Sequence, residues 1–428
     1  MCATVPPAVA WGQNEAAPAP AGVHVALSDA VKLARTKGYD VLGASAAVRG
    51  AEADVHAAGA TPNPIANGQV GVSTSCSTGS SCSGSPWGWG VGLSDNGLVE
   101  GALTRKRALK ESAAERAVEA AKFGRADAER VLAAQAKIQY VQTAAAALKI
   151  DFTKDVAASL AKSVEINRVR YPRVIDEGQL ARVEQEALKA DQEVDRARRD
   201  FRQQQIELAF ILGMQGSIPE IAVDKEVLKF RVPDALAQTN KEALFKTAYD
   251  NRPDRRQAAA RQAQSDAQIA FAKRSRFPDV SLSVNYAQQG TGDYTSSLPT
   301  WTFGAQLPIP LFYQQQGEVQ RAEADREAAS IQLQKIDGAL SADIESAYNA
   351  FLVAKAIVER FENSLLERAK KAREITSIQY NAGSGTLTDL LDANRSFVQV
   401  NSDYYAELVN YWTAVFLLEQ ATGKEIVP

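Results

Sequence analysis

The fold of this chain is decided by a long helical stretch, at the centre of which residues 131–152 read VLAAQAKIQYVQTAAAALKIDF. The surrounding stretch, 99–170, contains no proline and is rich in Ala, Glu, Arg, Lys and Leu, which are strong helix formers. Its apolar residues recur in steps of three and four: Val131, Ala134, Ile138, Val141, Ala145, Leu148 and Phe152. This spacing predicts a coiled-coil seam on a helix roughly 100 Å long, too long for one globular core. We therefore expect the helix to project as part of a long bundle or tube.

A second stretch of the same kind, 312–380, also lacks proline. Its apolar residues repeat the same spacing: Leu340, Ile344, Ala347, Phe351, Ala354, Val358, Phe361 and Leu365. Landmarks in the two stretches have nearly constant offsets: 214 residues from Pro64 to Pro278 and from Leu93 to Leu307, 209 from Tyr171 to Tyr380, and 210 from Gly213 to Gly423. These offsets indicate an internal duplication.

The duplication predicts a domain plan. A leader, 1–24, comes before a first repeat, 25–213; a linker, 214–238, leads to a second repeat, 239–423, and a tail, 424–428. The first repeat contains short helices, a β-hairpin at 65–94, the long helix 99–170 and a return helix at 180–212. The second contains short helices, a hairpin at 279–308, the long helix 312–380 and a return helix at 387–421.

The two predicted hairpins alternate apolar and small or polar residues with period two. The apolar positions include Trp87, Trp89, Val280, Leu282, Val284, Tyr286, Trp301 and Phe303. An aromatic face opposite a Gly/Ser face is typical of transmembrane barrel strands, with lipid outside and water inside. The alternative is two hairpins that pack on a soluble core. Four strands cannot close a barrel, so the first interpretation requires oligomerisation: eight strands from two copies or twelve from three.

Composition excludes several classes of function. A net charge of -3 gives no electrostatic reason to expect nucleic acid, and no run of 18 apolar residues is present. No Walker A sequence, nucleophile elbow or HExxH motif occurs, so we expect neither an enzyme nor a cofactor. With two His, two Met and three Cys, a dedicated metal site is not expected.

The three cysteines carry separate hypotheses. Cys2 lies in an apolar N-terminal segment that reads as a signal remnant; it is a candidate lipid anchor, although no lipobox precedes it. Cys76 and Cys82 lie in a polar loop of the first hairpin. In an oxidising compartment they could form a disulfide, and two free thiols are the alternative.

Three motifs resemble one family. They are Phe277-Pro278-Asp279-Val280 before a strand, the LPIPLF exit at 307–312, and YNAGSGTLTDLLDA at 380–393. With the twofold order of helix, hairpin, long helix and return helix, they resemble the TolC-type outer-membrane efflux proteins over about residues 25–423. The first-half exit, LSDNGL at 93–98, departs from the usual Pro-Leu-Phe and looks closer to the heavy-metal efflux branch.

The resemblance implies a mainly α fold with a small β part: a homotrimer with a 12-stranded barrel in the outer membrane and a helical tube across the periplasm. Such proteins are passive exit ducts of tripartite efflux or type I secretion systems, in contact with outer-membrane lipid, a periplasmic adaptor (membrane fusion) protein and an inner-membrane pump. The alternative from another class is a soluble periplasmic coiled-coil scaffold without a pore.

The resemblance also implies roles for residues at the helix reversals. Asp389 and Asp392 match an acidic ring that narrows the periplasmic end of the tube, and the alternative is that they simply favour the helix dipole. The first-half counterpart, 176–180, lacks this pair. The reversing turns would be the tips that contact the adaptor: Tyr171 and Gly178 in the first repeat, and Tyr380, Gly383 and Gly385 in the second.

Overall fold

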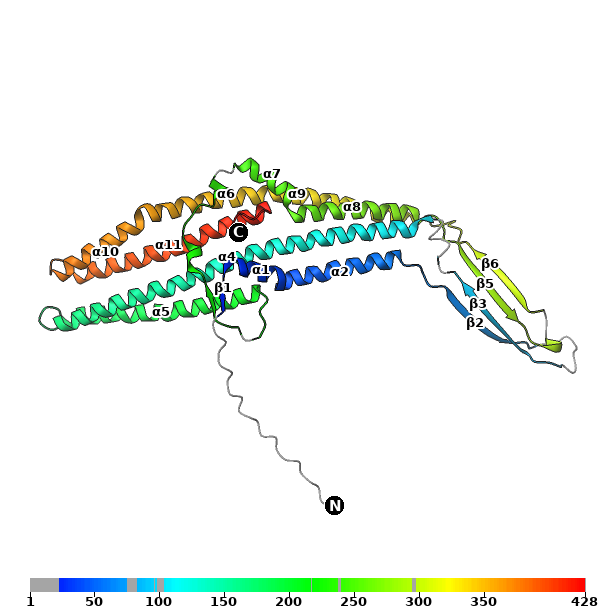
Figure 1. The fold of residues 1–428 in the computed structure, drawn as a ribbon, viewed down its shortest axis with the longest axis horizontal. Helices are drawn as coiled ribbons and strands as arrows, with labels where there is room; N and C mark the ends of the chain where they lie inside the picture. The colour runs from blue at the N-terminus through cyan, green and yellow to red at the C-terminus, as the bar shows by residue number, and fades with distance from the viewer. Residues whose placement is uncertain are drawn as a thin grey trace, which may run out of the picture.

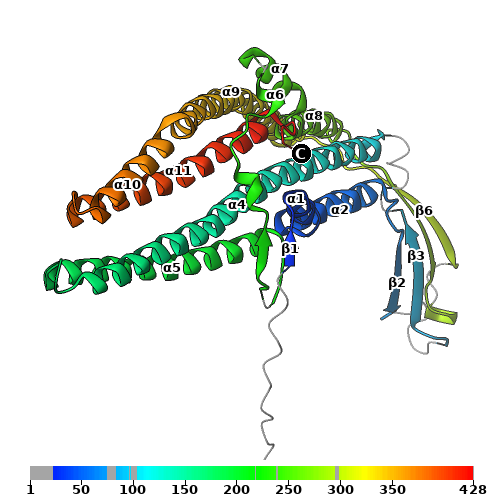
Figure 2. The ribbon, with the colours of Figure 1, turned by 60° about the vertical axis from the view of Figure 1, so that its left-hand side comes forward.

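The computed structural model has an elongated shape, with a small sheet at one end and two helical hairpin turns at the other (Figure 1). It describes residues 23–74, 83–95, 97, 104–216, 218–237, 240–294 and 298–427. Figure 2 shows the two helical hairpins, α4 with α5 and α10 with α11, side by side as they leave the middle of the molecule. Among the described residues, no helix is both long and apolar enough to cross a membrane.

The elements of the first half are β1 (Val23–Val25), α1 (Leu27–Lys37), α2 (Tyr39–Gly59), β2 (Ile65–Val72), β3 (Trp87–Ser94), α4 (Lys106–Arg170) and α5 (Glu177–Ile211). The connecting segment contains β4 (Ile221–Val223), the 3-10 helix η1 (Lys225–Leu228) and α6 (Asp234–Ala237). The second half contains α7 (Lys241–Asn251), α8 (Pro253–Arg274), β5 (Ser281–Gln288), the 3-10 helix η2 (Gly292–Tyr294), β6 (Thr300–Gln306), α9 (Gln316–Arg360), the π-helical turn η3 (Phe361–Leu365), α10 (Leu366–Asn381) and α11 (Leu387–Thr422). The division into domains stays a prediction.

The long helices begin later than their composition suggests. Helix α4 has 65 residues and starts at Lys106 rather than at 99, and residues 98–103 lie outside the described part of the chain. Helix α9 starts at Gln316 rather than at 312. In both cases the preceding residue, Arg105 or Gln315, has a left-handed backbone (φ 58° and 61°), which a right-handed helix cannot include.

The bounds of the second long helix and of the first return helix also differ from those expected. Helix α9 passes through η3 and continues as α10 to Asn381, so the second rod contains a π-helical turn that its spacing does not reveal. Helix α5 starts at Glu177, three residues before the predicted 180. It starts there because the Asp176 side chain accepts a hydrogen bond from the Gln179 N–H and caps the helix.

The four long strands form one antiparallel sheet in the order β2-β3-β5-β6. Because directly paired residues lie on the same face, the register places the aromatic positions together: Val70 pairs with Trp89, Tyr286 with Trp301, and Val284 with Phe303. Val280 precedes β5, which starts at Ser281, so this predicted lipid-facing residue lies outside the strand.

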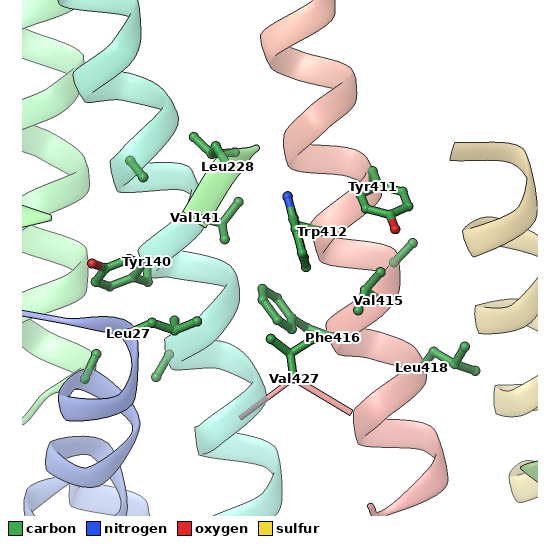
Figure 3. Close-up of a cluster of buried hydrophobic side chains, with 14 of the residues drawn as sticks. Leu27, Tyr140, Val141, Leu228, Tyr411, Trp412, Val415, Phe416, Leu418 and Val427 are labelled. Atoms are coloured by element: carbon green, nitrogen blue, oxygen red, sulfur yellow. The ribbon is translucent and has the colours of Figure 1, made fainter. Parts of the chain in front are cut away.

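The main core lies midway along the molecule, where α4 and α11 pack together. Figure 3 shows Trp412 and Phe416 of α11 facing α4, with Val427 between the two helices. The connecting segment is attached to the same region. The Tyr140 hydroxyl donates to the Val25 carbonyl at 2.9 Å and accepts from the Asp224 N–H at 2.8 Å. Strands β1 and β4 thereby form a two-stranded parallel sheet against α4.

Candidate functional site

The pair Asp389 and Asp392 lies in the first turns of α11, at the tip of the second hairpin. Asp389 forms a capping box with Thr386: its N–H donates to the Thr386 Oγ1 at 3.2 Å, and its carboxylate accepts from the Thr386 hydroxyl at 2.6 Å. The hydrogen bonds from the Thr386 side chain and backbone lower the pKa of Asp389 below its ordinary value. Asp389 is therefore held as an exposed anion, and within one chain its contacts are those of a helix cap.

Asp392 belongs to a charge network that joins the two hairpins. Its carboxylate accepts from Arg395, at 3.3 Å, and Arg395 also donates to Glu186 on α5. Lys189 pairs with the same glutamate at 3.3 Å. The pKa of Glu186 is lowered, first by the hydrogen bond from Arg395 and further by Lys189. Asp392 itself remains well exposed.

A buried polar pair lies between the two tips. The Tyr380 hydroxyl, at the end of α10, donates to the Oδ1 of Asn167 near the end of α4. Asn167 is 1% exposed, and its own amide donates to the Ser163 carbonyl at 2.8 Å. The Arg170 guanidinium lies 5.2 Å from the centre of the Tyr380 ring. Tyr380, predicted as a tip residue that contacts the adaptor, is buried between the hairpins.

The other predicted tip residues are not brought into this contact. Tyr171, Gly178 and Gly383 are exposed, and Gly385 is half-buried. Gly383 has φ 77°, a left-handed conformation that glycine adopts without the usual steric cost. The described structure therefore presents two short exposed turns, and the Tyr380–Asn167 contact joins the helices from which they extend. Their role in binding an adaptor stays a prediction.

The sheet presents two chemically distinct faces. On one face Trp89, Tyr286 and Trp301 form an aromatic row, with ring centroids 5.4 and 5.1 Å apart. The other predicted lipid-facing strand residues lie on this face and are exposed: Trp87, Leu282, Val284 and Phe303.

The opposite face carries small and amide residues. A Cβ at Gly92 would lie 2.2 Å or less from the Oδ1 atoms of Asn67 and Asn285, so the glycine makes room for two amides. The four strands contain no Asp, Glu, Lys or Arg. One face therefore suits a hydrocarbon environment, and the other an uncharged aqueous one.

The structure does not test the hypotheses on the three cysteines. Cys2, Cys76 and Cys82 all lie outside the described residues. Within the described part of the chain, no group of three or more His, Cys, Asp or Glu side chains is arranged to hold a metal ion.

Sequence reasoning missed the residues that join the hairpins. Asn167, Glu186 and Arg395 are ordinary polar residues within long helices, and no motif distinguishes them. The apolar seam that the sequence shows ends at Phe152, before Asn167, so it gave no signal of this contact.

Comparison with known proteins identifies relatives of this chain. Residues 244–424 match the family described as outer membrane efflux protein. Nodulation protein T of Rhizobium leguminosarum bv. trifolii is 31% identical over 188 residues, which are 42% of this chain and 39% of that protein. The cobalt-zinc-cadmium resistance protein CzcC of Cupriavidus metallidurans is 24% identical over 196 residues, 45% of each chain. The chain spans less than half the length of these curated relatives.

Among solved structures, the CmeC outer membrane channel of Campylobacter jejuni has the same fold over 93% of this chain and 85% of its own, with a TM-score of 0.74 and 17% identity. The resemblance to the TolC-type efflux family is confirmed, and the location is the outer membrane with an extension into the periplasm. The fold is mainly helical with a small sheet, and the relatives with this fold are channels rather than enzymes.

Proposed function

We propose that three copies of this chain, in which residues 244–424 match the outer membrane efflux protein family, form a passive exit duct. The sheet would contribute four strands to a 12-stranded barrel, and the helical hairpins would form a tube across the periplasm. An inner-membrane pump and a periplasmic adaptor would supply the energy and choose the cargo. The candidate cargoes are small molecules and metal ions, the latter because CzcC is named for cobalt-zinc-cadmium resistance.

The single observation that carries this proposal is the sheet. Strands β2 and β6 each pair with one other described strand, and the aromatic face is exposed. Edge strands with free N–H and C=O groups cannot remain open in a bilayer. Because β2 and β6 run in opposite directions, β6 of one copy can pair with β2 of the next and continue the antiparallel alternation. Closure by copies of the same chain therefore satisfies both edges and covers no aromatic side chain.

The segment after β6 supports the same assembly. Ile309, Leu311 and Phe312 are 71%, 73% and 97% exposed in the single chain. The segment between β6 and α9, to which they belong, lies where the sheet joins the helical part of the molecule (Figure 1), at the expected boundary between barrel and tube. Single exposed apolar side chains are normal on a monomer surface, but several that gather in one exposed segment are typical of an interface.

Within the duct, Asp389 and Asp392 would narrow the periplasmic end. Three copies would bring six carboxylates into one ring, which attracts cations and obstructs the tube when it is closed. The low pKa of Asp389 supports this role because its carboxylate stays charged at periplasmic pH. The exposed turns at Tyr171–Gly178 and Gly383–Gly385 would contact the adaptor.

The test is native mass spectrometry of protein extracted by detergent from outer membranes. We expect a mass of three chains, and replacement of Leu311 and Phe312 by Ser should shift it to single chains. The matched control is Leu298→Ser, which changes an equally exposed leucine in the loop before β6. A monomer or dimer of the parent protein, or its recovery only from the soluble fraction, would overturn the duct and favour a periplasmic scaffold.

A further inference from the structure

A cleft of about 380 Å³ lies between the two helical hairpins, between the central core and the hairpin tips. Residues from α4, α5, α10 and α11 line it. Its apolar wall consists of Phe152, Val156, Leu160, Leu391, Phe397 and Val398. Phe152 and Phe397 meet across the cleft with ring centroids 6.0 Å apart. The cleft is thus an apolar cavity built by both repeats.

The positive and negative charges around this apolar wall are unequal in number. Four cations line the cleft, Lys149, Lys189, Arg373 and Arg395, against two carboxylates, Glu186 and Glu193. Glu186 is already paired with Lys189 and Arg395.

The second carboxylate is also occupied. Glu193 pairs with Arg196, which is not among the residues that line the cleft. Neither carboxylate therefore neutralises Lys149 or Arg373, and the cleft has an excess of positive charge.

The two unneutralised cations lie beside the aromatic wall. The Arg373 guanidinium lies 4.7 Å from the centre of the Phe397 ring and donates to the Ser159 hydroxyl at 2.8 Å. Among the described residues Arg373 has no carboxylate partner. Lys149 lies one turn before Phe152 on α4 and is half-buried, and within the described part of the chain its ammonium group has neither an ion pair nor a hydrogen bond. A negative group bound here would gain two cationic partners in a partly desolvated site.

We propose that this cleft binds a single-chain amphipathic anion, with its apolar chain against Phe152 and Phe397 and its head group at Lys149 and Arg373. The volume is at the lower end of the range of about 300–1,000 Å³ found for ligand pockets, and it admits one alkyl chain rather than a two-chain phospholipid. The anion would contact α4 and α10 together, and so join the two hairpins. This site does not depend on pore formation, because one chain contributes every residue of the cleft.

The test uses dodecanoate as the probe, below its micelle concentration, with the full chain in phosphatidylcholine nanodiscs. Equilibrium dialysis against empty nanodiscs separates binding to protein from partition into lipid. We expect saturable binding, about one dodecanoate per chain. Dodecanol, which has the same chain without the charge, should bind at least about tenfold more weakly.

Two variants assign the site. The double change Lys149→Gln with Arg373→Gln should weaken dodecanoate binding at least about tenfold and leave dodecanol binding unchanged. The matched control, Lys154→Gln with Arg368→Gln, removes two exposed cations of α4 and α10 that do not line the cleft. The single variant Lys149→Gln keeps the test valid if the double variant misfolds, because the Lys149 side chain holds no other side chain in place.

Three results would overturn the inference: no binding above that of empty nanodiscs, equal affinity for dodecanol, or equal loss in the control variant. None of them bears on the duct, since the three-chain mass is measured separately. Conversely, a monomeric protein that binds dodecanoate with the expected dependence on Lys149 would keep the cleft and overturn the duct.

Discussion

Replacing Lys137 by Met should release the end of the chain from the central core. Lys137 is 1% exposed in the middle of α4, and its Nζ lies 2.6 Å from the Glu419 carboxylate of α11. It also donates to the Val427 carbonyl. Glu419 in turn accepts from the Ile426 and Val427 N–H groups, each at 3.1 Å. The ammonium and the carboxylate together hold segment 423–427 between α4 and α11.

The magnitude follows from the loss of one partner of a buried ion pair, which costs about 3–5 kcal/mol because the other charge is left uncompensated. The two backbone donors still stabilise the Glu419 carboxylate, so we expect the lower end, about 3 kcal/mol. Met keeps the length and apolar contacts of the Lys side chain, so little of this loss would come from packing. Where exchange follows the local opening equilibrium, a loss of about 3 kcal/mol corresponds to roughly 100-fold faster hydrogen exchange.

The assay is amide hydrogen exchange of residues 423–427, followed by mass spectrometry. The matched control is Lys154→Met, which changes an exposed lysine on the same helix and should leave exchange unchanged. Adding Glu419→Gln to Lys137→Met removes the uncompensated charge, and should recover part of the protection. If Lys137→Met changes exchange less than about threefold, or if the second substitution worsens it, the pair does not hold this segment and the reasoning fails.

Three further predictions concern the tips. Neutralising Asp389 and Asp392 together, as Asn, should raise single-channel conductance and reduce cation preference in planar bilayers, and unchanged values would count against the acidic ring. Tyr380→Phe should leave the buried Asn167 Oδ1 without its donor and reduce local stability by about 1–2 kcal/mol. The loss should appear as faster hydrogen exchange at the tips, and unchanged exchange would contradict a stabilising role for this contact. The folded-state pKa of Glu186 is lowered, so its cationic partners stabilise the fold above the unfolded value of 4.5, and this contribution is lost as the pH falls from 4.5 through the lowered pKa. Hydrogen exchange should therefore show the hairpins separating in that acidic window in the parent but not in Glu186→Gln, and an identical pH dependence in both would contradict this reasoning.

Much of the secondary structure could be read from the sequence because it is set by local periodicity. The three-and-four spacing of residues 131–152 predicts a helix whatever lies around it, and the structure has α4 over Lys106–Arg170. Alternation with period two likewise predicts which side of each strand is apolar, and the register brings Trp89, Tyr286 and Trp301 onto one face. The helix starts were less predictable, since the left-handed conformations of Arg105 and Gln315 are not encoded by a turn-forming residue type.

The contacts between the repeats were decided by tertiary structure alone. Tyr380 and Asn167 are 213 residues apart, Arg395 and Glu186 are 209 apart, and Lys137 and Glu419 are 282 apart. A polar side chain on a helix carries no local signal of its partner, because the partner depends on which faces meet when two rods pack. Local sequence patterns were enough to predict the long helices, the two-faced strands and the family resemblance. The tertiary structure decided which charges are neutralised, which tip residue is buried, and where an apolar cleft with excess positive charge remains.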